Sequence, residues 1–116
     1  MEKSIALKDP IAVTFYGEDE PVTYTKLVFK DYYEPKNQGM MLFSASGDDS
    51  ETLIATMNPS YLIEPGIVMI NVNDGLIKKQ ILPELIKRGI IAKEPCGEIK
   101  SGFVTYPAYQ LLVEDD

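Results

Sequence analysis

Short runs of apolar, β-branched and aromatic residues, one of them partly alternating with polar ones, recur along the chain and are separated by glycine, proline, asparagine or acidic residues. Such a pattern is typical of β-strands separated by turns. The strands predicted in this way span residues 11–16, 22–29, 40–45, 52–57 and 67–72. The first two and the next two are each joined by a turn-forming segment, so each pair is expected to form an antiparallel hairpin. The run at 67–72 is apolar on both faces, as in a central strand.

The periodicity changes to that of a helix between residues 76 and 88. Apolar residues fall on one side at helical spacing, namely Ile77, Ile81, Leu82, Leu85 and Ile86. Asn73 or Asp74 can cap the start of this helix, and Gly89 can end it in a left-handed conformation. Pro83 lies inside the segment, where it removes a backbone hydrogen bond and disturbs the helix. We therefore expect one kinked helical unit.

The chain ends in a last predicted strand at residues 103–113, followed by the acidic residues 114–116. Gly102 permits a bulge or a left-handed residue where this strand begins. Pro107 cannot donate a hydrogen bond to a sheet, which predicts that the second half of the strand lies at an edge or a bulge. The predicted fold class is α+β: a single domain of residues 1–116 with a mostly antiparallel sheet of five or six strands and one main helix packed on a face.

Composition limits the classes of function. The chain has 116 residues, 45% of them hydrophobic, and a formal net charge of −7. An acidic chain is a poor ligand for a phosphate backbone, so direct nucleic-acid binding is not expected. No apolar run reaches membrane-spanning length and the first residues lack a signal-peptide pattern, which predicts a cytoplasmic protein. The negative charge could meet a basic partner, including a nucleic-acid-binding protein, or could serve solubility alone.

Catalytic and metal-binding motifs are weak in this sequence. Histidine is absent, which removes the usual base of serine and cysteine hydrolases and the commonest zinc ligand. Residues 71–75 resemble a calcium loop only superficially, because the glycine and the twelfth-position ligand are misplaced. The carboxylates at 18–20 and 48–51 lie in predicted turns, and the chain has no histidine to activate the thiol of Cys96. We predict no catalytic residue, metal site or cofactor.

Tyrosine is the residue type that most favours a binding function. Five of the seven tyrosines flank predicted turns: Tyr32, Tyr33, Tyr61, Tyr106 and Tyr109. Tyrosine near a loop is enriched where one protein contacts another, because the ring supplies contact area at low entropic cost. The same rings could instead close the edges of the core. Both interpretations stay open at this point.

Three motifs in order carry a resemblance: the turn at residues 71–75 (NVNDG), the helix end at 88–91 (RGII) and the tail at 101–109 (SGFVTYPAY). Together they resemble an uncharacterised small-protein family, a domain of unknown function, found on bacteriophages, plasmids and conjugative elements. Its members carry an Asp-x-Asn-Asn turn, an Asn-Gly-Leu helix end and a Ser-Gly-aromatic-x-x-Tyr-Pro-x-Tyr tail. The likeness spans about residues 40–113 and rests mainly on the tail. It implies an accessory protein of a mobile element without supplying a mechanism.

Two functional hypotheses follow. In the first, the protein is a non-enzymatic accessory protein of a phage or mobile element that binds a host or phage protein, modulating or inhibiting a host defence protein through its acidic surface. In the second, it is a small-ligand-binding domain or an enzyme with a site between the helix start and the C-terminal strand. That site would be built from Asn73, Asp74, Ser101, Tyr106 and Tyr109. Homo-oligomerisation is left open by the sequence.

Overall fold

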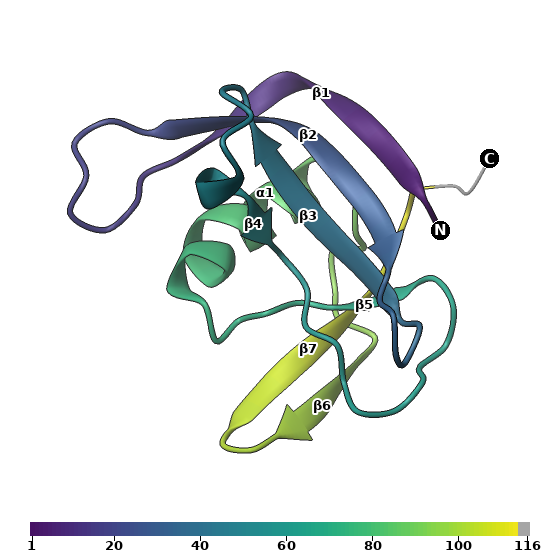
Figure 1. The fold of residues 1–116 in the computed structure, drawn as a ribbon. Coiled ribbons are helices and arrows are strands. Elements are labelled where there is room, and N and C mark those ends of the chain that lie inside the picture. The colour runs from purple at the N-terminus through teal and green to yellow at the C-terminus, as the bar shows by residue number, and fades with distance from the viewer. Residues whose placement is uncertain (114–116) are drawn as a thin grey trace.

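The computed structural model describes residues 1–113, so the acidic residues 114–116 that were predicted to end the last strand lie outside the described part. The protein is α+β, with two antiparallel sheets and a short helical segment (Figure 1). The elements in order are β1 (Lys3–Val13), β2 (Val22–Asp31), β3 (Gln38–Ser44), the 3₁₀-helix η1 (Asp49–Glu51), β4 (Leu53–Ile54), β5 (Ile67–Met69), the π-helix η2 (Ile77–Ile81), α1 (Leu82–Lys87), β6 (Gly97–Ser101) and β7 (Val104–Gln110).

The first sheet has four strands in the order β1-β2-β3-β4, and its first hairpin is the predicted one. Strand β1 begins at Lys3, well before the predicted start at residue 11. It consists of two segments that pair with β2, one on each side of a long bulge. Ala6 pairs with Lys26 and Ile11 with Tyr24, which leaves residues 7–10 outside the regular register. Those residues include charges and a proline, so the sequence pattern hides the strand. The predicted partner of β3 is reduced to the two residues of β4.

The second sheet has three strands in the order β5-β7-β6, which corrects two predictions. Strand β7 lies at the centre although it contains Pro107, and β5, predicted as a central strand, pairs with only one strand of this sheet. Pro107 accepts a hydrogen bond from the Ile70 amide at 3.1 Å, and the Ile70 carbonyl accepts one from the Val72 amide at 2.9 Å. Pro107 has no N–H to donate to the Ile70 carbonyl. The Val72 amide donates to that carbonyl instead, so it is not left without a hydrogen bond where β5 ends.

Strand β6 was not predicted at all. Residues 101–104 form a tight hairpin, in which Ser101 pairs with Val104 and only Gly102 and Phe103 lie in the turn. Gly102 has the positive φ of 63° that was expected of it, and its position as first turn residue is the pattern of a type II′ turn. The tail that was interpreted as one strand thus turns back on itself, and the hairpin of β6 and β7 projects from the rest of the molecule (Figure 1).

The two sheets are joined by an isolated bridge between Thr56 and Ile70. The Met57 amide donates to the Met69 carbonyl at 2.9 Å, which links the segment after β4 to β5. Buried side chains from both sheets and from the helical segment form the main apolar cluster, whereas Met69, Tyr106 and Ala108 form a smaller one. The predicted single sheet of five or six strands is therefore replaced by sheets of four and three strands.

The helical segment is continuous through η2 and α1, so it is one unit as predicted, and the irregularity takes the form of a π turn. The Leu82 amide bonds to the Ile77 carbonyl, five residues earlier, just before Pro83. A π turn is a known way for a helix to absorb a residue that does not fit the regular pattern. Ile77, Ile81 and Leu85 are fully buried in the main cluster. In the part of the chain described, no helix is long and apolar enough to span a membrane.

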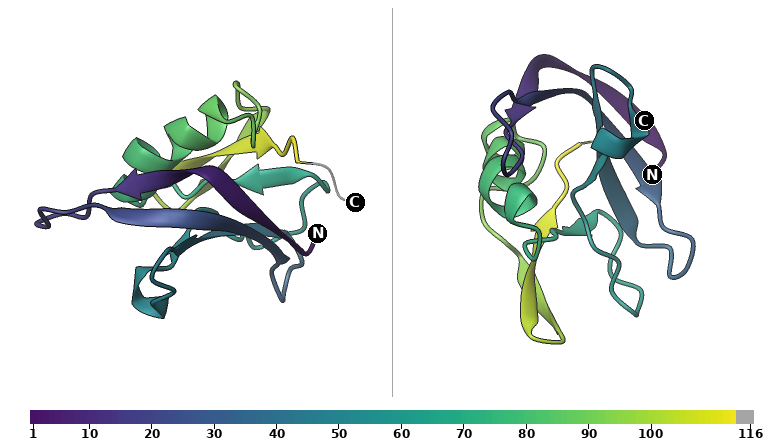
Figure 2. Two further views of the ribbon diagram at one scale, coloured as in Figure 1. Left: turned by 90° about the horizontal axis from the view of Figure 1, so that it is seen from above. Right: turned by 60° about the vertical axis from the view of Figure 1, so that its left-hand side comes forward.

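Figure 2 shows the helical segment beside the end of β1, and side chains of this segment bond to the backbone there. The Gln80 side chain accepts from the Thr14 amide at 2.9 Å and donates to the Thr14 carbonyl at 2.8 Å. Arg88 pairs with Glu84 at 3.0 Å and donates to the carbonyl of Asp9 in the bulge of β1. The helix thereby satisfies backbone groups in the irregular part of β1, at Asp9, and just after its end, at Thr14.

Candidate interaction site

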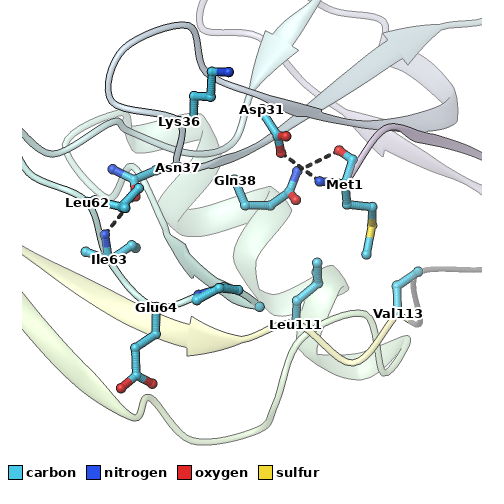
Figure 3. Close-up of a pocket in the computed structure, with 12 residues that line it drawn as sticks. Met1, Asp31, Lys36, Asn37, Gln38, Leu62, Ile63, Glu64, Leu111 and Val113 are labelled. Atoms are coloured by element: carbon cyan, nitrogen blue, oxygen red, sulfur yellow. Dashed lines mark hydrogen bonds and ion pairs between the residues drawn. The ribbon is translucent and has the colours of Figure 1, made fainter.

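Asparagine side chains form hydrogen bonds that join two loops far apart in sequence, residues 32–37 and 57–66. The Asn37 amide nitrogen donates to the Asn58 side-chain oxygen and to the Tyr61 carbonyl, both at 2.9 Å. The Asn37 side-chain oxygen accepts from the Ile63 amide at 2.8 Å (Figure 3). Asn58 in turn donates to the Pro35 carbonyl at 3.1 Å. We call the exposed surface of these two loops, together with the adjoining Ile54, the paired-loop surface.

Asn37 is the centre of this arrangement because only 3% of its surface is exposed. A buried amide is costly unless its donors and acceptor are all engaged, and here they are. The loop is also closed by its own backbone, since the Tyr32 amide donates to the Asn37 carbonyl at 2.8 Å. The Glu34–Pro35 peptide bond within the loop is cis. The position of each loop is thus fixed by the other.

A cavity of about 650 Å³ lies on one side of the paired loops (Figure 3). It is lined by Asn37, Gln38 and residues 62–66, with Leu111 and Val113 from the end of the described chain. Asp31 also lines it and forms an ion pair of 2.7 Å with the Met1 ammonium. Its lining is mixed in polarity, with few convergent polar groups of the kind that a catalytic site needs.

A smaller cavity of about 410 Å³ lies beside the first loop and is mainly apolar. Tyr32, Tyr33, Met40, Met41 and Ile54 contribute to its lining. The Tyr32 ring is held in position because its hydroxyl lies 2.9 Å from the Thr56 hydroxyl and 3.2 Å from the Thr56 carbonyl oxygen. Tyr33 has no such anchor among the contacts seen, and 92% of its surface is exposed.

Large hydrophobic side chains are exposed across the paired-loop surface. Besides Tyr33, the exposed fractions are 68% for Leu62, 53% for Tyr61 and 51% for Ile54. Apolar and aromatic side chains held on fixed loops are the kind that anchor protein–protein contacts. The two loops carry two carboxylates, Glu34 and Glu64, against one amine, Lys36. Beside them, Asp31 is paired with the Met1 ammonium and Lys30 lines the smaller cavity, so the charge around the apolar groups is mixed.

The predicted interaction residues separate into two groups. Tyr32 and Tyr33 line the smaller cavity, and Tyr61 lies on the second loop, whose backbone is bonded to Asn37 of the first. Asn73, Asp74, Tyr106 and Tyr109 line neither cavity. Whether they form a site of their own stays a prediction.

The local contacts of this second group are structural. Asp74 caps the helical segment, since its side chain accepts from the Leu76 amide at 2.9 Å, as the capping prediction required. Asn73 is exposed, and Tyr106 and Tyr109 are buried. Burial, together with the nearby Glu94 carboxylate, raises the pKa of Tyr109. Ser101, named with them in the second hypothesis, is an exposed residue of β6.

The remaining reactive groups have ordinary surroundings. Asp48 accepts from the Ser50 amide at 3.0 Å and the Ser50 hydroxyl at 2.8 Å, and these bonds lower the pKa of its carboxyl. Cys96 is exposed, and its thiol lies 3.5 Å from the Ala108 carbonyl oxygen. Within residues 1–113, no three acidic or cysteine side chains are grouped as metal ligands would be.

No family model matches the chain, and no curated protein or solved structure matches it. The resemblance of the tail to a mobile-element family therefore stays a prediction.

Sequence reasoning missed Ile54 and Leu62, which belong to the paired-loop surface, and Asn37 and Asn58, which hold its two loops together. The two asparagines lie next to prolines and turn residues, which is also the usual setting of a solvated loop. Nothing in the local pattern marks them as residues that bond to each other across two loops.

Proposed function

We propose that this protein is a non-enzymatic accessory protein that acts by binding another protein through the paired-loop surface. The observation that carries the proposal is the set of exposed side chains, Tyr33, Tyr61, Leu62 and Ile54, on loops locked together by the buried Asn37. Because the loops are already fixed, a partner does not have to order them on binding, and less free energy is lost. An exposed aromatic ring beside an apolar cavity, such as Tyr33, is a favourable anchor.

The proposed partner has a basic surface, including that of a nucleic-acid-binding protein. Support comes from the formal net charge of −7 of the whole chain. Charge complementarity of this kind speeds association and rejects acidic partners. With the resemblance of the tail taken into account, the proposal extends to a cytoplasmic phage or mobile-element protein that modulates or inhibits a host protein, a defence protein among them.

The proposal is tested by affinity capture from a bacterial lysate with matched tyrosine variants. The wild-type protein is compared with Tyr33→Ala combined with Tyr61→Ala, and with Tyr16→Ala as the control. Tyr16 is fully exposed, at 103%, but lies on the loop between β1 and β2. A partner that binds through the paired loops is retained by wild type and by the control and is lost by the double variant.

Two results would contradict this proposal. The first is a partner retained equally by all three proteins, which would place binding elsewhere. The second is the capture of no partner while a thermal-shift screen of metabolites yields a stabilising ligand, which would favour the small-ligand hypothesis.

A further inference from the structure

Strand β6 leaves one edge of the second sheet open. It is the terminal strand in the order β5-β7-β6, and it pairs along its whole length with β7. Because the two-residue turn is closed by Ser101 and Val104, these two residues exchange hydrogen bonds, and so do Ile99 and Tyr106 two positions away. The N–H and C=O groups of the alternate residues, Glu98 and Lys100, therefore point away from the sheet.

We propose that β6 pairs antiparallel with β6 of a second copy of this chain, about a two-fold axis at Ile99. In this register Glu98 lies opposite Lys100 of the second copy, and Lys100 lies opposite Glu98. Both are residues whose backbone groups point outward, so each pair can exchange two hydrogen bonds across the junction. The arrangement is isologous and closed, so it forms a dimer and not a filament.

The charges on β6 select this register over its neighbours. Glu98 and Lys100 are both exposed and point to the same face of the strand. Opposite charges directly across an antiparallel pair are stabilising, whereas like charges are not. An axis at Glu98 would place two carboxylates together, and an axis at Lys100 would place two amines together. Charged residues usually protect an edge strand from pairing. Here the order of Glu98 and Lys100 places opposite charges across from one another when two copies of the edge pair.

Apolar groups beside this edge fit the same partner. Ile99 is half-buried and packs against the smaller core cluster, so the register sets two such residues side by side across the axis. Phe103 is fully exposed, at 106%, on the hairpin tip. The register brings that tip next to the segment around the exposed Pro95 of the second copy. Figures 1 and 2 show the hairpin projecting from the rest of the fold, which leaves room for the second chain.

Sedimentation velocity over a concentration series tests the dimer with charge-reversed variants of the full chain. Wild type is expected to dimerise as concentration rises. Glu98→Lys and Lys100→Glu are each expected to weaken self-association about tenfold or more, because each places like charges opposite one another twice. An equimolar mixture of the two variants restores opposite charges at both positions, so it is expected to form a heterodimer about as readily as wild type dimerises. Glu20→Lys, in the exposed turn before β2, carries the same charge change and is expected to leave dimerisation unaffected.

Amide hydrogen exchange gives an independent readout. The amides of residues 98 and 100 should become protected from exchange as the wild-type protein is concentrated. In the Glu98→Lys variant without the Lys100→Glu variant, the same two amides should not become protected. A wild-type protein that stays monomeric throughout would overturn the proposal, as would variants that dimerise like wild type or a mixture that does not associate. Loss of the paired-loop partner by the tyrosine variants is a separate result, so the dimer and the proposed function fail independently.

Discussion

Replacement of Asn37 by alanine tests whether the two loops are held together as described. The change removes three hydrogen bonds, to Asn58, to the Tyr61 carbonyl and from the Ile63 amide. Each is worth about 0.5–1.5 kcal/mol net, and partners left buried without a bond add to the loss. We therefore expect the free energy of unfolding to fall by about 2–4 kcal/mol, with a decrease in Tm of roughly 10 °C.

Urea unfolding and amide hydrogen exchange measure this effect. In Asn37→Ala the Ile63 amide should exchange much faster than in wild type, because its acceptor is gone. Asn73→Ala is the matched control: Asn73 is exposed, so its loss should change stability by less than about 0.5 kcal/mol. Equal stability of the two variants, or unchanged protection of Ile63, would refute the idea that Asn37 joins the loops.

Three further predictions concern the framework of the site. Gly39→Ala would place a Cβ 2.8 Å from the Lys30 carbonyl oxygen, so it should destabilise the protein by about 1–3 kcal/mol in urea unfolding, whereas Gly75→Ala, with nothing within 4 Å, should not. Burial raises the pKa of Tyr24 to about 12, so the unfolded chain loses this proton near pH 10 while the folded chain keeps it. Stability should therefore be complete below pH 10 and fall as the pH approaches 12, and Tyr24→Phe should show a smaller fall. Gln80→Ala removes two hydrogen bonds to the first hairpin and should lower the free energy of unfolding by about 1–2 kcal/mol; unchanged stability would contradict that role.

The parts of the fold that the sequence predicted are those set by neighbouring residues. The first hairpin and the helical segment follow from local periodicity, as does the capping by Asp74. Strand β6 was missed because a run with charges on both sides of Ile99 has little apolar signal, and its pairing depends on a turn at Gly102 that was interpreted as the start of one strand. The central position of β7, which contains Pro107, depends on where β5 ends, and β5 is far from Pro107 in sequence.

The candidate site was predictable only in part for the same reason. Tyr32, Tyr33 and Tyr61 were singled out because tyrosines near turns favour contacts, and they lie on the two loops that Asn37 joins, although their role in binding stays a prediction. The asparagines that fix this surface, Asn37 and Asn58, bond across more than twenty positions of sequence. A local pattern cannot distinguish such an asparagine from a solvated one, because the difference arises only when the two loops meet.

The most direct test of binding through the paired-loop surface is site-specific photo-cross-linking in a bacterial lysate. A photoreactive residue is placed at position 33, 61 or 62 in turn, and at position 16 as the exposed control. The proposal predicts one and the same partner cross-linked from the three loop positions and absent from position 16. Adducts from position 16 alone, or from none of the three loop positions, would contradict it.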